Sequence, residues 1–560
     1  GGVYVDGSSG GTIKNCILYG NRALSGVSDY QAANSPIITF SYLTPSYAGA
    51  GNLAVSDPQF MDYAGKDYRL RPGSPCLHTG TNLAWMTGAT DLDGNPRISP
   101  TGGTPDMGCY EYPVGALDGN LIASPLSGLE PVSVVLTAYT QGTNTSGLYY
   151  KWGFTNSSVV DVQGSDRQVA TNLYAGGIWS VTLTVTNGAG EADTCTRSNY
   201  LSVGPLTNHV WLNGGNVAPY VSWANAATSL QAAVNAAVDG TTVLVTNGVY
   251  AITNTLTIGV GAAVRSVNGA SGTLIRRVES GGSPEFTPVR LDNSQAVLDG
   301  FTVTNGFEFT CSGVYLTAGT LRNCILRLNG YSGAYRPGAP VYMVTGLVEN
   351  CTVTSNYAWY GAGAINMANG TVRNCIIDRN TAYEAPVAGV QMTGAGGVVR
   401  NCLIVRNTSQ YPNCAGGVSM SAGAVENCTV AGNSNTSGGV GVGGVSASGG
   451  TLRNTIIYSN AVAAGASTNY SFSGASVTYG DLFPPYAGAG NIASDPLFVN
   501  AAGGVFTLQS ASPCIDRGTN LAWALLPGAV DLAGHSRRQG AAVDMGCYEL
   551  RPRGTLYIVR

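Results

Sequence analysis

The chain has 560 residues, a formal net charge of −4, 10% charged residues and 44% hydrophobic residues. This composition excludes an intrinsically disordered protein, and the length exceeds what one ordinary hydrophobic core accommodates. No block of basic residues is present, which argues against nucleic acid as a partner, and no apolar run reaches the roughly 18 residues of a membrane span.

The N-terminal segment, residues 1–112, matches residues 440–550 almost throughout. KNCILYGN corresponds to RNTIIYSN, GSPCLHTGTNLAW to ASPCIDRGTNLAW, and PDMGCYE to VDMGCYE. We interpret this as the duplication of a module of roughly 440 residues, with residues 1–112 as the final coils and cap of a first copy. Because Gly1 falls inside a repeat, we expect the sequence to be a piece of a longer protein, and the absence of a signal peptide says nothing about location.

Residues 113–205 alternate apolar and polar residues, as in SVVLTAYT and WSVTLTVTN, with turn residues between the runs. A period of two predicts a small antiparallel β-sandwich. Residues 206–550 begin differently, because Ser229–Asp239 (SLQAAVNAAVD) predicts an amphipathic helix. A helix before the first coil would cover the open end of a solenoid and protect its strand edges.

One phrase then occurs six times between residues 323 and 460, at steps of 24 to 27 residues: RNCILRLN, ENCTVTSN, RNCIIDRN, RNCLIVRN, ENCTVAGN and RNTIIYSN. A fixed period of this size predicts a solenoid, whose coils lie ~4.8 Å apart. We expect the first asparagine of each phrase to form a hydrogen-bonded ladder, and the cysteines an internal stack. The ladder would contain Asn323, Asn350, Asn374, Asn401, Asn427 and Asn454, and the stack Cys324, Cys351, Cys375, Cys402 and Cys428.

These coils resemble right-handed parallel β-helices of the pectate-lyase-like superfamily, over residues 206–500 and in part over residues 1–60. The closing segment DPLF…SPCIDRGTN…VDMGCYE is similar to the C-terminal cap of secreted bacterial β-helix repeat proteins. Residues 113–205 resemble a PKD domain through Trp152-Gly153-Phe154 and the run around Trp179, although Gly153 replaces the usual acid of that motif, so no role of that acid carries over.

The resemblance implies an all-β fold in which right-handed parallel β-helix (solenoid) modules flank an immunoglobulin-like PKD β-sandwich. Residues 206–550 would be a complete β-helix with an N-terminal capping helix and a C-terminal cap. Residues 551–560 would be a tail or the start of a next segment.

Two cysteine pairs recur in both caps with the same separation of 33 residues: Cys76 with Cys109, and Cys514 with Cys547. We predict a disulfide in each cap, with buried free thiols as the alternative. Disulfides would indicate an oxidising, extracellular location.

The stacked cysteines of the coils are expected to be small core residues, because side chains that point the same way have poor geometry for bridging. His78, His209 and His535 do not lie at ligand spacing from two cysteines, so no metal site is predicted from them.

A calcium site is an alternative at Asp91, Asp93 and Asn95, whose oxygens alternate along the chain. The second copy keeps Asp531 but has Ala533 and His535 at the other two positions. A turn in which the acid accepts backbone N–H groups is therefore the preferred interpretation, and no cofactor is predicted.

The coils contain few acidic residues that could act in catalysis, and these include Asp299, Asp378 and Glu384, with Arg327 nearby. If the protein is an enzyme, Asp378, Arg379 and Arg406 are the candidate catalytic residues, because they fall on adjacent coils. They do not provide the paired carboxylates of glycoside hydrolysis or a multi-carboxylate calcium site. We therefore predict no catalytic residue.

Aromatic residues are frequent in the loops that follow each second asparagine, and stacked coils would align them into a strip. Such a strip can stack on sugar rings or contact a protein, although it can also simply cover the side of the β-helix. The predicted ligand-binding residues are Tyr331, Tyr335, Tyr357, Trp359, Tyr360, Tyr383 and Tyr411.

The sequence thus favours a structural or adhesive section of a long, modular, secreted or cell-surface bacterial protein. Expected partners are a polysaccharide, other surface proteins, or further copies of the chain in a fibre. The alternative is a polysaccharide lyase or glycoside hydrolase acting on an acidic polysaccharide.

Overall fold

The structure is a computed structural model that describes residues 2–5, 11–23, 26–27, 30–32, 36–53, 57–63, 65–71, 73–98, 103–112, 117–142, 144–154, 162–278, 286–330, 337–438, 441–463 and 469–550. The chain divides into two compact units, Gly1–Val203 and Gly204–Arg560. The predicted tail at residues 551–560 lies outside the described residues.

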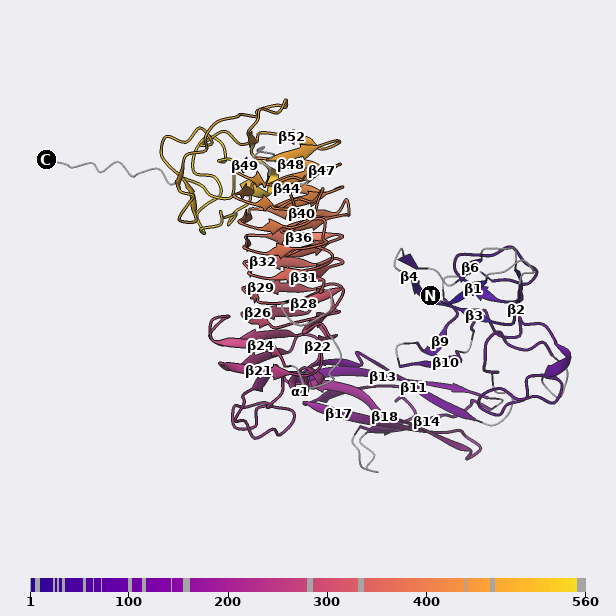
Figure 1. Ribbon diagram of the computed structural model, residues 1–560. Coiled ribbons are helices and arrows are strands. Elements are labelled where there is room, and N and C mark those ends of the chain that lie inside the picture. Colours follow the sequence, from indigo (N-terminus) through magenta and orange to yellow (C-terminus); the bar gives the residue numbers. More distant parts are fainter. Residues whose placement is uncertain are drawn as a thin grey trace. The chain divides into compact units, whose positions relative to one another are not determined.

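The second unit is a parallel β-helix, whose strands stack coil upon coil in Figure 1. Its first sheet contains β19 (Thr207–Val210), β20 (Thr242–Val245), β23 (Ala263–Ser266), β26 (Val297–Asp299), β29 (Thr320–Arg322), β32 (Leu347–Glu349), β36 (Gly370–Arg373), β40 (Gly397–Arg400), β44 (Ala424–Glu426), β48 (Thr451–Arg453) and β52 (Ser476–Thr478). Its second sheet contains β21 (Gly248–Ile252), β24 (Thr273–Arg277), β27 (Thr302–Thr304), β30 (Ile325–Arg327), β33 (Thr352–Thr354), β37 (Ile376–Asp378), β41 (Leu403–Val405), β45 (Thr429–Ala431), β49 (Ile456–Tyr458) and β53 (Asp481–Leu482).

A third sheet follows the first two around the coils, and a fourth sheet runs through five of the coils. The third contains β22 (Leu256–Ile258), β25 (Val289–Leu291), β28 (Cys311–Leu316), β31 (Ala339–Met343), β35 (Ile365–Met367), β39 (Val390–Met392), β43 (Val418–Met420), β47 (Val445–Ala447) and β51 (Tyr470–Phe472). The fourth contains β34 (Tyr357–Ala358), β38 (Thr381–Ala382), β42 (Thr408–Ser409), β46 (Ser434–Asn435) and β50 (Ala461–Val462). A hairpin of β54 (Phe498–Asn500) and β55 (Val505–Leu508) belongs to the segment that follows the last coil.

The core of the β-helix consists of columns of apolar side chains, because each strand repeats the inward positions of the strand before it. In the first sheet Leu321 pairs with Val348, Val348 with Val372, and Val372 with Val399, and all four side chains are fully buried. Each such side chain contributes about 1.5–3 kcal/mol through burial. The cysteines Cys324, Cys351, Cys375, Cys402 and Cys428 are 0–1% exposed and belong to the same core.

The predicted helix is present but shorter, as α1 (Leu230–Asn235). Its buried residues Leu230, Ala233 and Val234 pack into the core of the β-helix beside the first strands. The helix therefore covers the N-terminal end of that core.

Two asparagines in each phrase have different roles, and this corrects the predicted ladder. The first asparagines occupy the left-handed region, with φ between +48° and +55°, at the turn between the first and second sheets. Only alternate neighbours among them are linked by amides, as in Asn350 to Asn323 at 3.3 Å and Asn401 to Asn374 at 2.7 Å. Asparagine tolerates this backbone conformation, so these residues act mainly as turn residues.

The second asparagines form the continuous ladder. Each donates its side-chain amide to the Oδ1 atom of the next at 2.9–3.1 Å. The ladder contains Asn329, Asn356, Asn380, Asn407, Asn433, Asn460 and Asn469, all at most 3% exposed. The sequence signal was present, because all six phrases end in asparagine.

The first unit contains two antiparallel sheets around one core and a set of short strands before them. One sheet is β11 (Asp118–Ser124), β13 (Val132–Gln141) and β16 (Val169–Tyr174). The other is β12 (Ser127–Leu129), β18 (Ala192–Gly204), β17 (Gly177–Thr186), β14 (Tyr149–Gly153) and β15 (Val162–Gly164). Trp152 is fully buried between them and donates to the carbonyl of Arg167 at 2.8 Å. The resemblance of residues 113–205 to PKD domains remains a prediction.

Residues 2–112 begin with three parallel pairs, as expected for final coils: β1 (Val3–Val5) with β6 (Tyr30–Ala32), β2 (Thr12–Lys14) with β7 (Ile37–Thr39), and β3 (Ile17–Leu18) with β8 (Tyr42–Leu43). Two antiparallel pairs accompany them: β4 (Arg22–Ala23) with β5 (Gly26–Val27), and β9 (Phe60–Asp62) with β10 (Asp67–Leu70). We call the segments after the final coils, residues 57–112 and 495–550, the first and second caps.

The first cap and the antiparallel sheets are joined by buried polar contacts. Arg197 of β18 pairs with Asp67 of β10, and its guanidinium also donates to Asn120 Oδ1 at 2.7 Å. Tyr200 donates to Asp62. These contacts hold the first cap on the sandwich within the first unit.

The predicted disulfides are not formed in this structure, where all thirteen cysteines are free thiols. The Cys514 thiol contacts Asp481 Oδ2 at 3.1 Å, and the Cys547 thiol contacts Thr429 Oγ1 at 3.4 Å. Burial raises the pKa of Cys76 and of Cys547 to about 12, whereas Cys109 is exposed. The cysteines therefore give no support to an extracellular location.

Candidate functional site

The three residues proposed for catalysis lie together at one corner of the β-helix. Asp378 ends β37, Arg379 follows it with φ at +52°, and Arg406 occupies the same corner one coil later with φ at +53°. Arg406 Nε donates to Asp378 Oδ1 at 2.8 Å, and Arg379 Nη2 lies 2.9 Å from Asp378 Oδ2. Coil register alone therefore predicted this cluster.

The cluster has little capacity for acid–base catalysis. Both oxygens of Asp378 are engaged by arginines, and its side chain is only 5% exposed. Asp299 lies on another sheet, where it pairs with Arg265 at 3.1 Å and Arg322 at 3.0 Å. Within the described residues, no group of three or more His, Cys, Asp or Glu side chains is arranged to hold a metal ion.

Asp91 is the acceptor of a turn, as preferred from the sequence. Its Oδ1 accepts the backbone N–H of Asp93 at 2.9 Å and of Asn95 at 2.7 Å, and its Oδ2 accepts the N–H of Glu111 at 2.8 Å. Asp531 accepts the equivalent three N–H groups in the second cap. Oxygens that already accept several N–H groups fit a structural turn and do not fit a calcium site.

The aromatic strip is present in part. Trp359 and Tyr383, on neighbouring coils, have ring centroids 4.5 Å apart, and Tyr360 lies 5.3 Å from Phe309. Tyr383 is 37% exposed and Tyr411 45% exposed. Tyr357 is half-buried in β34, and Tyr331 and Tyr335 lie outside the described residues. The rings thus form local pairs.

A second candidate surface, which sequence reasoning missed, follows the outer face of the third sheet. Parallel register aligns one outward position on successive strands: Arg290, Tyr315, Tyr342, Asn366, Gln391, Ser419, Ser446 and Ser471. We call these eight residues the outer column. They lie one coil apart, at the ~4.8 Å spacing of neighbouring strands.

The column changes chemistry along the axis. At one end the Tyr315 and Tyr342 rings are stacked, with centroids 5.0 Å apart and an interplanar angle of 16°, and the Arg290 guanidinium lies 4.6 Å from the centre of the Tyr315 ring. At the other end a shallow groove of about 170 Å³ is lined by hydroxyl and amide side chains, including Gln391, Ser419 and Ser446. An aromatic platform therefore leads into a polar groove. The loops of unequal length between the strands hid this alignment from the sequence.

A family model described as the right-handed beta helix region matches residues 288–462 and 338–512. No curated protein matches the chain. The matched residues coincide with the coils that carry the asparagine ladder and the outer column. Among the described residues, no helix has the length and apolar character needed to cross a membrane.

Proposed function

We propose that this right-handed β-helix repeat protein is a structural or adhesive section of a modular extracellular or cell-surface protein, and that the outer column binds an extended polysaccharide parallel to the β-helix axis. The column of aromatic, amide and hydroxyl side chains, repeated once per coil, carries this proposal. The duplicated module supports a role as one section of a longer assembly.

The chemistry of the column suits a neutral glycan. The ring edges and phenol hydroxyls of the stacked Tyr315 and Tyr342 offer apolar and hydrogen-bonding contacts to a sugar, and the amides and hydroxyls beyond them both donate and accept hydrogen bonds. The one charge of the column, Arg290, is already paired with Asp292 at 2.7 Å. A repeat of ~4.8 Å places one side chain opposite about one sugar of an extended chain.

The proposal is tested by titrating soluble polysaccharides into the intact chain, with neutral and acidic polymers compared by calorimetry. We expect one neutral polymer to bind, and Tyr342→Ala to weaken it at least tenfold. Tyr149→Ala, which removes a tyrosine that is 38% exposed on β14, is the matched control and should leave affinity unchanged. Failure of every polymer to bind, or equal loss in both variants, would overturn the proposal.

The alternative function is a polysaccharide lyase or hydrolase, favoured only by the cluster of Asp378 with Arg379 and Arg406. Because both arginines neutralise Asp378, we expect no new chain ends when the protein is incubated with the same polymers. Release that Asp378→Asn abolishes would establish the enzyme instead.

A further inference from the structure

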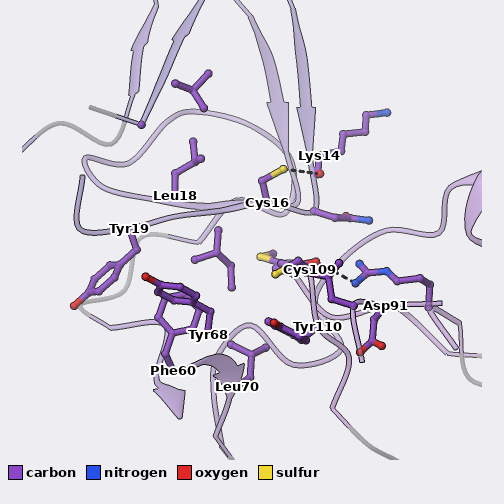
Figure 2. A pocket seen from close by; sticks show the side chains of 18 of the residues that line it. Lys14, Cys16, Leu18, Tyr19, Phe60, Tyr68, Leu70, Asp91, Cys109 and Tyr110 are labelled. Atoms are coloured by element: carbon purple, nitrogen blue, oxygen red, sulfur yellow. Dashed lines mark hydrogen bonds between the residues drawn. The ribbon is translucent and has the colours of Figure 1, made fainter. Parts of the chain in front are cut away.

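A cavity of about 830 Å³ lies in the first unit, where Figure 2 shows Asp91 on one side and the rings of Tyr19 and Phe60 on another. Asp91 already accepts three backbone N–H groups, and Arg97, which also lines the cavity, pairs with Glu111 at 3.1 Å. The capacity of both residues to pair with a ligand is therefore used within the protein. Positive charges without such partners lie on the second sheet of the β-helix.

The second sheet carries an arginine on every second coil. At one outward position, parallel register aligns five residues of successive coils: Arg276, Thr304, Arg327, Thr354 and Asp378. On the fifth of these coils Arg379 follows Asp378 at the corner, so a positive charge recurs there. Arginines thus lie on the first, third and fifth coils, roughly 9.6 Å apart along the axis, which is two strand spacings. We call Arg276, Arg327 and Arg379 the arginine row.

The arginine row is accessible and keeps an excess of positive charge. Arg276 and Arg327 are exposed, and neither forms an ion pair within the described part of the chain. Arg379 is 60% exposed, although its Nη2 lies 2.9 Å from Asp378 Oδ2. Arg406, one coil further, donates to the other oxygen of Asp378 at 2.8 Å. Four arginines therefore face one acid, which leaves a net charge of +3 on this surface.

The residues between the arginines are small and uncharged. Thr304 is 8% exposed and Thr354 is half-buried, so neither obstructs the row. Beside Arg276 lies a hollow of about 510 Å³, whose lining includes Thr304, Asn305 and Leu328. A linear ligand can therefore lie along the row, with charged groups over the arginines and neutral groups over the threonines.

The spacing of the row selects among linear polyanions. Duplex DNA carries a phosphate about every 3.4 Å of axis on each strand, which is much denser than the row. An extended sugar chain advances about one coil spacing per sugar, so two coils correspond to about two sugars. A polysaccharide with an acid on every second sugar can place each acid on an arginine. A polymer with an acid on every sugar would leave half of its charges facing threonine.

We propose that the arginine row binds an extended polysaccharide in which every second sugar carries a carboxylate, with the chain parallel to the β-helix axis. Each guanidinium can present two parallel N–H groups to a carboxylate, and this bidentate contact is stronger than a neutral hydrogen bond. The site lies on a different sheet from the outer column and takes a ligand of different charge. Because the arginines are exposed, the affinity falls as salt is raised.

The test is calorimetry on the intact chain with a hyaluronan octasaccharide, in which glucuronate alternates with a neutral sugar. We expect this probe to bind at least tenfold more tightly than a galacturonate octasaccharide, which carries twice as many carboxylates, and than a single-stranded DNA octamer. Equal or tighter binding of either comparison probe would show that charge density governs affinity, and would overturn the proposal.

Variants of the chain test the position of the charge. Arg327→Gln should weaken binding of the hyaluronan octasaccharide at least tenfold. Arg453→Gln, which removes an exposed arginine from β48 of the first sheet, is the matched control and should leave the affinity unchanged. The double variant Arg327→Gln with Thr354→Arg keeps the net charge but moves it by one coil, so it should not restore the affinity. Restored affinity, or an equal loss in the control, would contradict the proposal.

The arginine row and the outer column lie on different sheets, so their ligands should bind independently. We expect Arg327→Gln to keep its affinity for the neutral polymer that the outer column binds. A parallel loss of neutral and acidic binding in this variant would mean that both polymers use one surface, and would refute a separate acidic site. Failure of the neutral polymer alone would count against the outer column and leave the result for the arginine row intact.

Discussion

Asn407 donates its side-chain amide to Asn433 Oδ1 at 2.9 Å, one coil further along the β-helix. Its remaining polar atoms are also paired, because its Nδ2 donates to the carbonyl of Ile377 at 2.9 Å and its Oδ1 accepts from Asn380 at 2.9 Å. The residue is fully buried. A buried amide in this position holds its own coil and both neighbours at once.

We expect Asn407→Ala to destabilise the β-helix by about 3 kcal/mol, because it leaves partners on both adjacent coils buried without hydrogen bonds. The control is Asn350→Gly, which removes an exposed turn asparagine and replaces it with the residue best suited to φ at +53°. The Asn350→Gly variant should lose less than about 1 kcal/mol of unfolding free energy. Hydrogen exchange of peptides from residues 347–438 measures both variants, and equal losses of protection would refute the distinction between the two asparagines.

Neighbouring coils approach each other closely at Gly389, and this leads to a second prediction. A Cβ atom there would lie 2.0 Å from the carbonyl oxygen of Gly417 on the next coil, whereas at the exposed Gly259 it would meet nothing within 4 Å. We expect Gly389→Ala to cost about 3 kcal/mol by forcing the coils apart, and Gly259→Ala to change stability by under about 0.5 kcal/mol. Thermal unfolding compares them, and a neutral Gly389→Ala would show that the coils separate freely.

The contact between the first cap and the antiparallel sheets of the first unit should be sensitive to acid. Burial raises the pKa of Asp67, but hydrogen bonding to Arg197 and the charges of Arg197 and Arg69 outweigh it, so the pKa lies below its usual value. A lowered carboxyl pKa stabilises the folded state above the unfolded value of about 3.9, and this contribution is lost as pH falls through the folded pKa.

We therefore expect the first cap to loosen only below about pH 4. Asp67→Asn should lower stability by about 3 kcal/mol at pH 7 and remove the acid transition. Asp166→Asn, at a side chain that is 76% exposed, is the control and should do neither. Hydrogen exchange in β9 and β10 across pH 6 to 2 gives the readout, and an acid transition that survives in Asp67→Asn would assign it to another group.

The cluster around Asp378 should behave as a structural corner. Asp378→Asn removes a buried partner from two arginines that are 60% and 38% exposed and can turn to solvent, so we expect a loss of about 1 kcal/mol. Asp292→Asn, from the exposed pair with Arg290, should cost less than about 0.5 kcal/mol. Urea denaturation of the second unit compares the losses of unfolding free energy in the two variants. If Asp378→Asn instead stabilises the protein, this would indicate strain of the kind stored at functional sites.

Several features were accessible from the sequence because they depend only on the period. Coil stacking placed Asp378 beside Arg406 and buried the cysteines from Cys324 to Cys428, since equivalent positions recur at one strand spacing. The inward face of α1 followed from its helical periodicity. These are consequences of repetition and need no knowledge of the loops.

Other features depended on turn geometry and loop length. Both asparagines of a phrase repeat equally well, so the period cannot tell Asn401, which makes a left-handed turn, from Asn407, which points inward. The residues that align on the third sheet are separated by loops of unequal length, so the stacking of Tyr315 on Tyr342 appears only once the strands are in register. The thiols of Cys514 and Cys547 recur at a spacing that suits a disulfide, yet in the structure they contact Asp481 and Thr429.

By itself, the sequence determined a β-helix of stacked coils, its capping helix and the duplication of its cap. The reason is that each repeat can bury its apolar face only by stacking on its neighbours. Tertiary structure alone decided which polar side chains point inward, which outward residues align on the third sheet, and that Cys109 is exposed while Cys547 is buried. The reason is physical: side-chain direction at a turn and contacts between distant segments depend on backbone conformation and packing, which a repeat pattern does not encode.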